Sequence, residues 1–279
     1  MLIDCHGSPG SQNGYDNSGH AGNTLWQSGN NLNQSIAILE TIAAKYGAAE
    51  YSDVVPAIEI VNEPLNSAPN SFATTKTWAK QAYHAMKGVA TNQQLMIISH
   101  DSFMGQSNWE DVGNALNTLE PDSKAESMFA LDYHFYQNSQ AADNALTQEQ
   151  HIQKACSYTT QVKASSNIPV FVGEFSAATN ICAFTDGTTT GATTCSAKGC
   201  QCTSNVWINA WNQPLMDATT KFFEAQLDAF ENSYQGFFMW NYKGNGAWGM
   251  DELFKYGIMG GLTGKITDRK FPPQCSFSS

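Results

Sequence analysis

The sequence is poor in positive charge. Its 279 residues include 14 lysines and arginines against 25 aspartates and glutamates, so the formal net charge is −11 at pH 7. Nucleic acids and anionic membranes both select basic surfaces, and neither is expected as a partner. No apolar run approaches the ~20 residues that a membrane-spanning helix needs. Hydrophobic residues make up 42% of the chain, which is enough to build a globular core.

Several common catalytic motifs are missing as well. The segment Gly7–Gly14 is rich in glycine, but it has neither the Lys-Ser/Thr ending of a Walker loop nor GxGxxG spacing. No G-x-S-x-G elbow supports serine hydrolase chemistry. We interpret this segment and the residues after it as a rim loop that brings polar side chains into a cleft, namely Gln12, Asn13, Asp16 and Asn17.

Metal-ligand motifs are also lacking. The chain has 6 histidines, and no two of them are spaced i, i+4. The conceivable ligands would come from separate segments: His6, His100, Asp101 and His134. We therefore expect no metal and no cofactor.

Cysteine is present in an odd number, 7 residues. Cys182, Cys195, Cys200 and Cys202 cluster in a segment rich in glycine, threonine and serine. A zinc site is an alternative, but no histidine lies near the cluster and its spacing matches no standard zinc ribbon, so disulfides are favoured. Disulfides indicate an oxidising compartment. Three bridges would leave Cys5, in an apolar strand, as a buried free thiol.

Strand and helix patterns alternate along the chain. Six apolar runs are predicted as strands: Met1–Cys5, Val54–Val61, Gln94–Ser99, Met128–Tyr133, Ile168–Gly173 and Gly236–Asn241. Apolar stripes at helical spacing lie between them, and Thr147 with Gln150 forms a possible capping box. The alternation implies a parallel sheet. Without an internal repeat or a linker, we predict a single domain over residues 1–279.

Polar residues follow nearly every predicted strand. They are His6, Asn62 with Glu63, His100 with Asp101, His134 with Tyr136, Glu174, and Trp240 with Lys243. A (β/α)8 barrel needs eight units, whereas a doubly wound sheet tolerates six strands. The positions of the polar residues favour the barrel, because a barrel directs all these strand ends to one mouth. We therefore predict the α/β class, a (β/α)8 TIM barrel of which about six units are present.

Glu63 and Glu174 end two predicted buried strands that are far apart in sequence. Taken alone, each glutamate is as consistent with an ordinary structural residue at a strand end as with a catalytic one. Neighbouring strand ends on a barrel rim can hold two carboxyls about 5–5.5 Å apart, which is the separation that retaining glycoside hydrolysis requires. Together with the other polar strand ends, the pair favours an acid/base and a nucleophile. The amide of Asn62 suits a sugar 2-hydroxyl.

Aromatic residues and hydroxyl-binding groups accompany the two carboxylates. His134 and Tyr136 alternate along one strand, so both side chains are expected on the same side, where they would bind sugar hydroxyls and orient Glu174. Tyr15 and Trp240 lie just beyond predicted strand ends and are our candidates for sugar platforms. Two further tryptophans, Trp207 and Trp211, are expected to pack beneath the disulfide loop.

Six segments of the chain are distinctive as a set, and their order along the sequence is His6–Gly19, Ile58–Pro64, Asp132–Gln137, Val172–Ser176, Glu224–Phe230 and Thr267–Cys275. In sequence and in order, these segments resemble the motifs of the fungal exo-β-1,3-glucanases of glycoside hydrolase family 5. The resemblance extends from Met1 to the C-terminus.

The resemblance implies a (β/α)8 barrel that releases glucose from β-1,3-glucan ends with retention of configuration. It makes Glu63 the acid/base and Glu174 the nucleophile. The subsite where the bond breaks would be lined by His6, Asn62, His134, Tyr136 and Trp240, with Tyr15 at the cleft entrance. It also implies a Cys156–Cys275 bridge, a second bridge from Cys182, a β-glucan or oligosaccharide as substrate, a monomer, and a secreted or cell-wall location.

Two departures from the family pattern leave alternatives open. Asn138 and Ser139 stand where the family has an apolar residue and a phenylalanine that clamps the next sugar. Met1–Cys5 corresponds to barrel strand three, so the two βα units and the arginine that the family has ahead of this strand lie outside the chain, as does the signal peptide expected of a secreted protein. The alternatives are a non-catalytic or vestigial carbohydrate-binding protein, and an enzyme for β-1,6-glucan or small β-glucosides.

Overall fold

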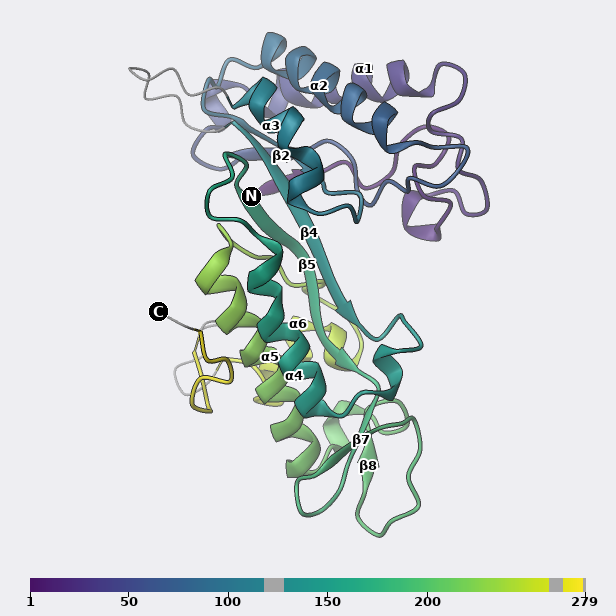
Figure 1. The fold of residues 1–279 in the computed structure, drawn as a ribbon, viewed down its shortest axis with the longest axis vertical. Helices are drawn as coiled ribbons and strands as arrows, with labels where there is room; N and C mark the ends of the chain where they lie inside the picture. Colours follow the sequence, from purple (N-terminus) through teal and green to yellow (C-terminus); the bar gives the residue numbers. More distant parts are fainter. Residues whose placement is uncertain (118–127, 261–267, 278–279) are drawn as a thin grey trace. The chain divides into compact units, whose positions relative to one another are not determined.

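The computed structural model describes residues 1–117, 128–260 and 268–277 (Figure 1). The chain forms two compact units, residues 1–133 with 163–171 and residues 134–162 with 172–279. Two strands, β4 (Phe129–Gln137) and β5 (Val170–Thr179), contribute residues to both units. The single-domain organisation stays a prediction.

The main sheet has five strands in the order β1-β2-β3-β4-β5. Its first strands are β1 (Leu2–Asp4), β2 (Ala57–Glu59) and β3 (Met96–His100), and the pairs from β1 to β4 are parallel. The first five predicted strands are therefore confirmed. Because the strands are parallel, their carboxyl ends lie at the same edge of the sheet.

The helices of the first unit are α1 (Asn31–Tyr46), α2 (Phe72–Val89) and α3 (Glu110–Leu116). α1 and α2 run side by side in Figure 1 and pack against each other. Leu39 of α1 and Trp78 of α2 are fully buried, as their apolar stripes predict. Among the described residues, no helix combines the length and apolarity that crossing a membrane requires.

In the second unit, α4 (Gln148–Cys156) packs along α5 (Gln213–Ser233), as Figure 1 shows. The predicted capping box at the start of α4 is present: Gln150 donates its backbone N–H to the Thr147 hydroxyl, and its side chain accepts from Thr147 N. Phe135 of β4 stacks on Tyr158 with ring centroids 3.9 Å apart. A short helix, α6 (Met250–Lys255), follows later in the chain.

The sixth predicted strand, Gly236–Asn241, is wrong as a strand. Only an isolated parallel bridge joins Val172 to Phe237. Val172 N donates to Gly236 O, and Val172 O accepts from Phe238 N. In an unbroken parallel ladder Trp240 N would next donate to Glu174 O, but here it donates to Phe175 O. The pairing slips by one residue, and the regular ladder stops there.

A small antiparallel sheet follows β5 and was not predicted. It contains β6 (Ile181–Ala183), β7 (Thr189–Gly191) and β8 (Gln201–Cys202) in the order β7-β6-β8. The disulfide Cys182–Cys202 joins β6 to β8, and Cys195–Cys200 closes the loop before β8. Cys5 is a free thiol, but it is half-buried rather than buried as expected.

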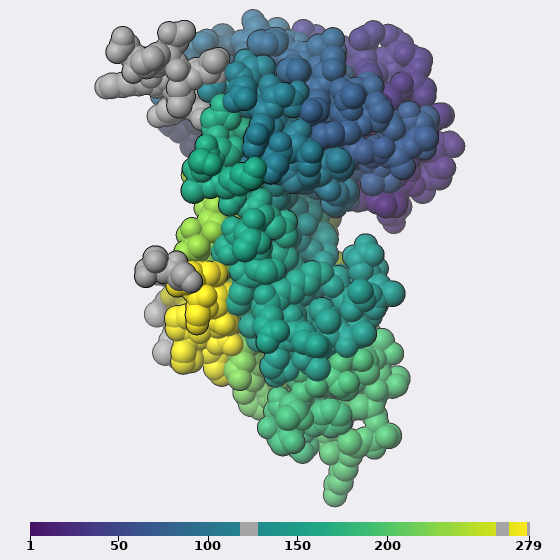
Figure 2. All heavy atoms as spheres, in the orientation of Figure 1, coloured from purple at the N-terminus to yellow at the C-terminus, as the bar shows by residue number. Residues whose placement is uncertain are grey.

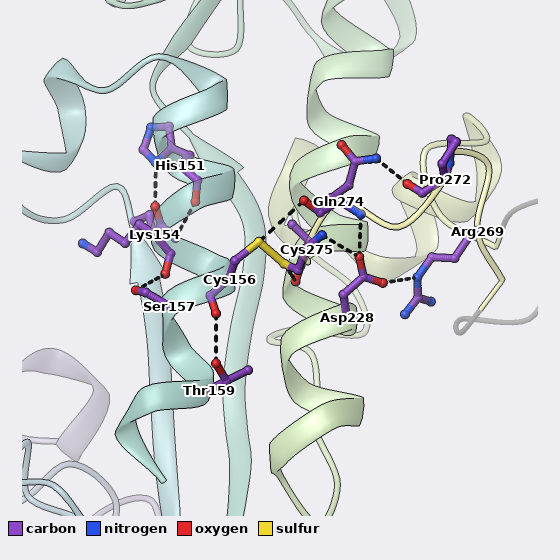
Figure 3. The surroundings of a disulfide bond; sticks show 12 residues. His151, Lys154, Cys156, Ser157, Thr159, Asp228, Arg269, Pro272, Gln274 and Cys275 are labelled. Carbon is purple, nitrogen blue, oxygen red and sulfur yellow. Dashed lines mark hydrogen bonds and ion pairs between the residues drawn. A yellow bond between two sulfur atoms is a disulfide. The ribbon is translucent and has the colours of Figure 1, made fainter. Parts of the chain in front are cut away.

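The third disulfide, Cys156–Cys275, ties the end of α4 to the C-terminal segment (Figure 3). Asp228 of α5 holds the same segment: its carboxylate accepts from Gln274 N at 2.8 Å and from the Arg269 side chain at 3.1 Å. Glu224, one helical turn earlier, accepts from Phe271 N at 3.1 Å. The Thr267–Cys275 motif thus anchors the segment to α5, although Thr267 itself lies outside the described residues.

Candidate active site

The carboxyl ends of β1 and β2 bring His6 and Asn62 together. His6 Nδ1 lies 2.6 Å from Asp4 Oδ2, and His6 Nε2 lies 3.4 Å from Asn62 Nδ2. A neutral imidazole that donates Nδ1–H to the carboxylate keeps Nε2 as an acceptor for the amide. Asp4 therefore fixes the imidazole in the tautomer that contacts Asn62.

The rim loop is pinned by Gln12, which is fully buried. Its side-chain amide donates to His6 O at 2.9 Å and to Asn62 O at 2.8 Å, and its oxygen accepts from Ser8 N. The expectation that Gln12 and Asn13 project into a cleft is wrong, since both are buried. Buried amides must satisfy their hydrogen bonds internally, and here they do so by holding backbone groups in place.

Glu63 lies four residues beyond the end of β2, at a left-handed backbone position with φ +46°. Such a conformation costs a non-glycine residue about 1 kcal/mol or more and is enriched at functional sites. Asn17 Nδ2 donates to Glu63 Oε2 at 3.0 Å, and Asn17 Oδ1 accepts from Asn13 Nδ2 at 3.1 Å. The rim loop thus orients the carboxylate through Asn17. Asp16, the remaining member of the predicted set, is exposed.

At the end of β3, His100 and Asp101 organise a turn. His100 is fully buried and accepts from Ser102 N through Nδ1 at 3.0 Å. Asp101 accepts from the backbone N–H groups of Phe103 and Gly105. Both residues hold the local backbone, which is the structural role that such strand-end residues most often have.

Glu174 lies within β5, in the second unit, and is 9% exposed. The Tyr136 hydroxyl donates to Glu174 Oε2 at 2.6 Å, and His134 Nδ1 lies 3.4 Å from the same oxygen. β4 continues as far as Gln137, so His134 and Tyr136 lie inside the strand and not beyond its end as predicted. Their alternation places both side chains toward Glu174, as expected, while Phe135 packs on the other face.

A second aromatic ring contacts Tyr136, the residue that donates to this carboxylate. The Tyr136 ring lies 5.2 Å from that of Trp248. The backbone N–H of Trp240 donates to Phe175 O, which fixes the start of the segment that runs on to Trp248. Asn241 and Trp248 are joined by a backbone hydrogen bond of 2.8 Å. Trp240 and Tyr15 are 39% and 50% exposed, so both present ring surface to solvent, each in its own unit.

The predicted site residues therefore fall into two groups. The first unit contains His6, Tyr15, Asn62 and Glu63, and the second contains His134, Tyr136, Glu174 and Trp240. The separation of about 5–5.5 Å between the carboxyls of Glu63 and Glu174 stays a prediction, as do their catalytic roles. Sequence reasoning missed Asp4 and Trp248. Only the i, i+2 spacing of Asp4 and His6 on one strand could have pointed to the first of them.

The cysteine cluster offers no thiolates for a metal. Cys182 and Cys195 are each joined to a partner in a disulfide, so their sulfurs are not available as ligands. Around His6 and Glu63 in the first unit, hydrogen bonds join carboxylates, amides and the His6 imidazole to one another. This arrangement suits proton transfer and the binding of hydroxyl groups.

Known proteins resemble this chain along its length. The family model "Cellulase (glycosyl hydrolase family 5)" matches residues 1–242. The glucan 1,3-beta-glucosidase of Schwanniomyces occidentalis is 34% identical over 287 aligned positions, which cover 99% of this chain and 63% of that protein. The sporulation-specific glucan 1,3-beta-glucosidase of Saccharomyces cerevisiae is 32% identical, with coverage of 99% and 62%. The chain thus spans less than two thirds of the length of these relatives.

Solved structures show the same fold at lower identity. The rutinosidase of Aspergillus niger matches with a TM-score of 0.62 and 16% sequence identity, over 92% of this chain and 66% of that one. This likeness, with the parallel strands and their helices, confirms the predicted class of an incomplete (β/α) barrel. The family model covers well over half of the sequence, and the chain belongs to glycosyl hydrolase family 5.

Proposed function

We propose that the chain acts as a retaining glycoside hydrolase that releases glucose from the non-reducing ends of β-1,3-glucan. Glu174 is the nucleophile and Glu63 the acid/base. The observation that carries the proposal is the contact of Tyr136 and His134 with one oxygen of Glu174. Family membership and the named activity of the relatives, glucan 1,3-beta-glucosidase, support the choice of reaction and substrate.

The contacts of Glu174 support its proposed role as the nucleophile. The hydrogen bond from the Tyr136 hydroxyl to Oε2 stabilises the ionised carboxylate and fixes its orientation. His134 contacts the same oxygen from two residues earlier on β4. A carboxylate fixed at one oxygen attacks the anomeric carbon with the other, at little cost in conformational entropy.

The proposal assigns proton transfer to Glu63. The neutral amide of Asn17 donates to Glu63 Oε2, and this contact is compatible with either protonation state of the carboxyl. In the first step, protonated Glu63 gives its proton to the glycosidic oxygen, which leaves with the electrons of the broken C–O bond while Glu174 bonds to the anomeric carbon. In the second, ionised Glu63 takes a proton from water, and the water oxygen displaces Glu174.

The remaining side chains of the proposal bind sugar. Asn62 is oriented by His6, which Asp4 holds in one tautomer, so its amide can meet a sugar hydroxyl. Tyr15 and Trp240 offer exposed rings for the apolar faces of pyranoses. Three disulfides support an oxidising location, which we propose is the cell wall or the surrounding medium, where the chain acts as a monomer.

The stereochemistry of azide rescue tests both roles. Glu174→Ala removes the nucleophile, so kcat on laminarin should fall by about 10^4-fold or more. With azide and an activated aryl β-glucoside, this variant should give the α-glucosyl azide, because azide attacks directly at the anomeric carbon. Glu63→Ala should give the β-glucosyl azide, because azide then attacks the anomeric carbon of the glucosyl–enzyme intermediate and displaces Glu174. Full hydrolysis by either variant refutes the assignment.

Leaving-group dependence distinguishes the acid from other supporting residues. Glu63→Ala should lose most activity on laminari-oligosaccharides and far less on a nitrophenyl glucoside, whose leaving group needs no proton. Binding of laminari-oligosaccharide by the wild-type chain with no glucose release would favour the non-catalytic alternative. A panel of β-1,3, β-1,6 and aryl glucosides measures the linkage preference.

A further inference from the structure

Trp207 departs from expectation: it is 74% exposed and does not pack beneath the disulfide loop. Its neighbour Trp211 is buried, and donates its ring N–H to Val206 O at 2.9 Å. The two tryptophans border a pocket of about 310 Å³ within the second unit. The pocket lies beside the disulfide-linked segment after β5, whose green residues protrude at one end of that unit in Figure 2.

The lining of this pocket is aromatic and polar but uncharged. Its residues are Thr203, Ser204, Asn205, Val206, Trp207, Ile208, Trp211, Asn245 and Gly246. None of these nine side chains ionises, although the chain carries a net charge of −11. Hydroxyls and amides both donate and accept hydrogen bonds, and the tryptophans supply flat apolar surface. A neutral ligand with one apolar face and several hydroxyl groups fits this chemistry.

The walls of the pocket are held in place before any ligand arrives. The Cys182–Cys202 bridge precedes Thr203 directly, and the Thr203 hydroxyl donates to Thr179 O at 2.6 Å. Gln201 of β8 donates to Ala210 O and accepts from Asn212 N, so the backbone on both sides of Trp211 is fixed to β8. A preorganised site binds more tightly because little conformational entropy is lost.

The far wall belongs to the segment that carries the aromatic rings near Glu174. Asn245 and Gly246 precede Trp248, whose ring contacts Tyr136, the hydrogen-bond donor to Glu174. Glu252 fixes this wall by accepting from Gly246 N at 2.7 Å. One short segment thus lines the pocket and reaches the side chains around the nucleophile, so a polymer occupying both places is the simplest ligand.

We propose that this pocket is a second carbohydrate-binding site, which holds a glucosyl unit of a β-glucan away from the bond that is cleaved. The Trp207 ring stacks on one pyranose face, while Asn205, Ser204 and Asn245 bind hydroxyl groups. The choice of β-glucan as occupant rests on the proposed function. The pocket itself rests on its own geometry, and its role is to keep the polymer attached between cleavage events.

Affinity electrophoresis tests the site, with Trp207→Ala, Trp207→Phe and the control Phe254→Ala, which removes an exposed ring outside the pocket. The full chain is run in gels that contain laminarin, in the Glu174→Gln background so that the polymer is not consumed. Trp207→Ala should raise the apparent dissociation constant about tenfold, as truncation of a stacking aromatic does. Trp207→Phe should recover much of the loss, and Phe254→Ala should match the parent. Added salt should change little, because no lining residue is charged.

The same substitutions with Glu174 intact separate the pocket from the chemistry. Trp207→Ala should leave kcat/KM on a nitrophenyl β-glucoside unchanged, because that substrate has a single glucosyl unit, which is the one that is cleaved. If laminarin gels retain Trp207→Ala as strongly as the parent, the second site is refuted. It is also refuted if gels that contain α-linked dextran retain the parent as strongly as laminarin gels do. A chain that hydrolyses nothing but loses laminarin retention with Trp207→Ala would refute the proposed function and still support the pocket.

Discussion

His151 makes a direct prediction about stability in acid. It lies on α4 and is fully buried, with Nδ1 2.8 Å from Gln137 Oε1 and its ring 5.7 Å from that of Phe222. Because Nδ1 donates to Gln137, the neutral ring carries no proton on Nε2. Within the described ranges Nε2 has no hydrogen-bond partner, so protonation would bury a charge and an unsatisfied donor together.

Burial lowers the pKa of His151 from 6.5 to about 4, against a smaller opposing effect of Asp143, while Lys154 lowers it further. Between these two values the unfolded chain binds a proton and the folded chain does not. The free energy of unfolding therefore falls as the pH falls from 6.5 to about 4, and the contribution of His151 is complete above pH 6.5. The size of the pKa change sets an upper bound of about 3 kcal/mol on this loss.

The assay is urea unfolding of the parent and His151→Gln at a series of pH values across this window. The variant should be less stable than the parent at neutral pH, since its contact with Gln137 is altered. The difference in free energy of unfolding between the two should narrow or reverse toward pH 4, because only the parent has the histidine that titrates. His84→Gln, at an exposed histidine of α2, is the matched control and should follow the parent. The reasoning would be refuted if plots of the free energy of unfolding against pH ran parallel for His151→Gln and the parent across this window.

Two further predictions concern the cross-links and the support of the active site. Replacing Cys156 and Cys275 by serine opens a loop with a sequence separation of 119, so the free energy of unfolding should fall by about 4–5 kcal/mol. The same replacement of Cys195 and Cys200, whose separation is 5, should cost about 2 kcal/mol. Equal losses for the two pairs would contradict the argument from loop length. Asp4→Ala should lower kcat about 10- to 100-fold with little change in KM and should shift the acid limb of the pH–rate profile, because the tautomer of His6 is no longer fixed. An unchanged profile with reduced thermal stability would instead indicate a purely structural Asp4.

Much of the barrel could be predicted because its strands are continuous apolar runs covered on both faces. The segment Ile168–Gly173 is of this kind, and it became the first part of β5. Its true end was missed because β5 continues to Thr179, through residues that are polar yet buried, such as Glu174 and Ser176. A functional strand end breaks the apolar pattern by which strands are recognised, so its boundary is the least predictable part.

The rest of the candidate site depended on contacts that sequence spacing does not encode. The alternation of His134 and Tyr136 was enough to predict their contact with Glu174. Gln12 was misplaced because a polar residue in a glycine-rich loop is expected at the surface, whereas this amide satisfies buried backbone groups. Trp207 was misplaced for the opposite reason, since a large apolar ring is expected in a core and here lies exposed.

The backbone at Glu63 has an evolutionary consequence. At φ +46° glycine or asparagine would relieve conformational strain, so the glutamate is not the residue that stability alone would select. In a lineage where catalysis no longer mattered, substitutions at this position would be favoured, or at least not opposed, by folding. Position 63 is therefore expected to drift early when the chemistry is lost, while the buried Gln12, which supports the fold around it, should drift late.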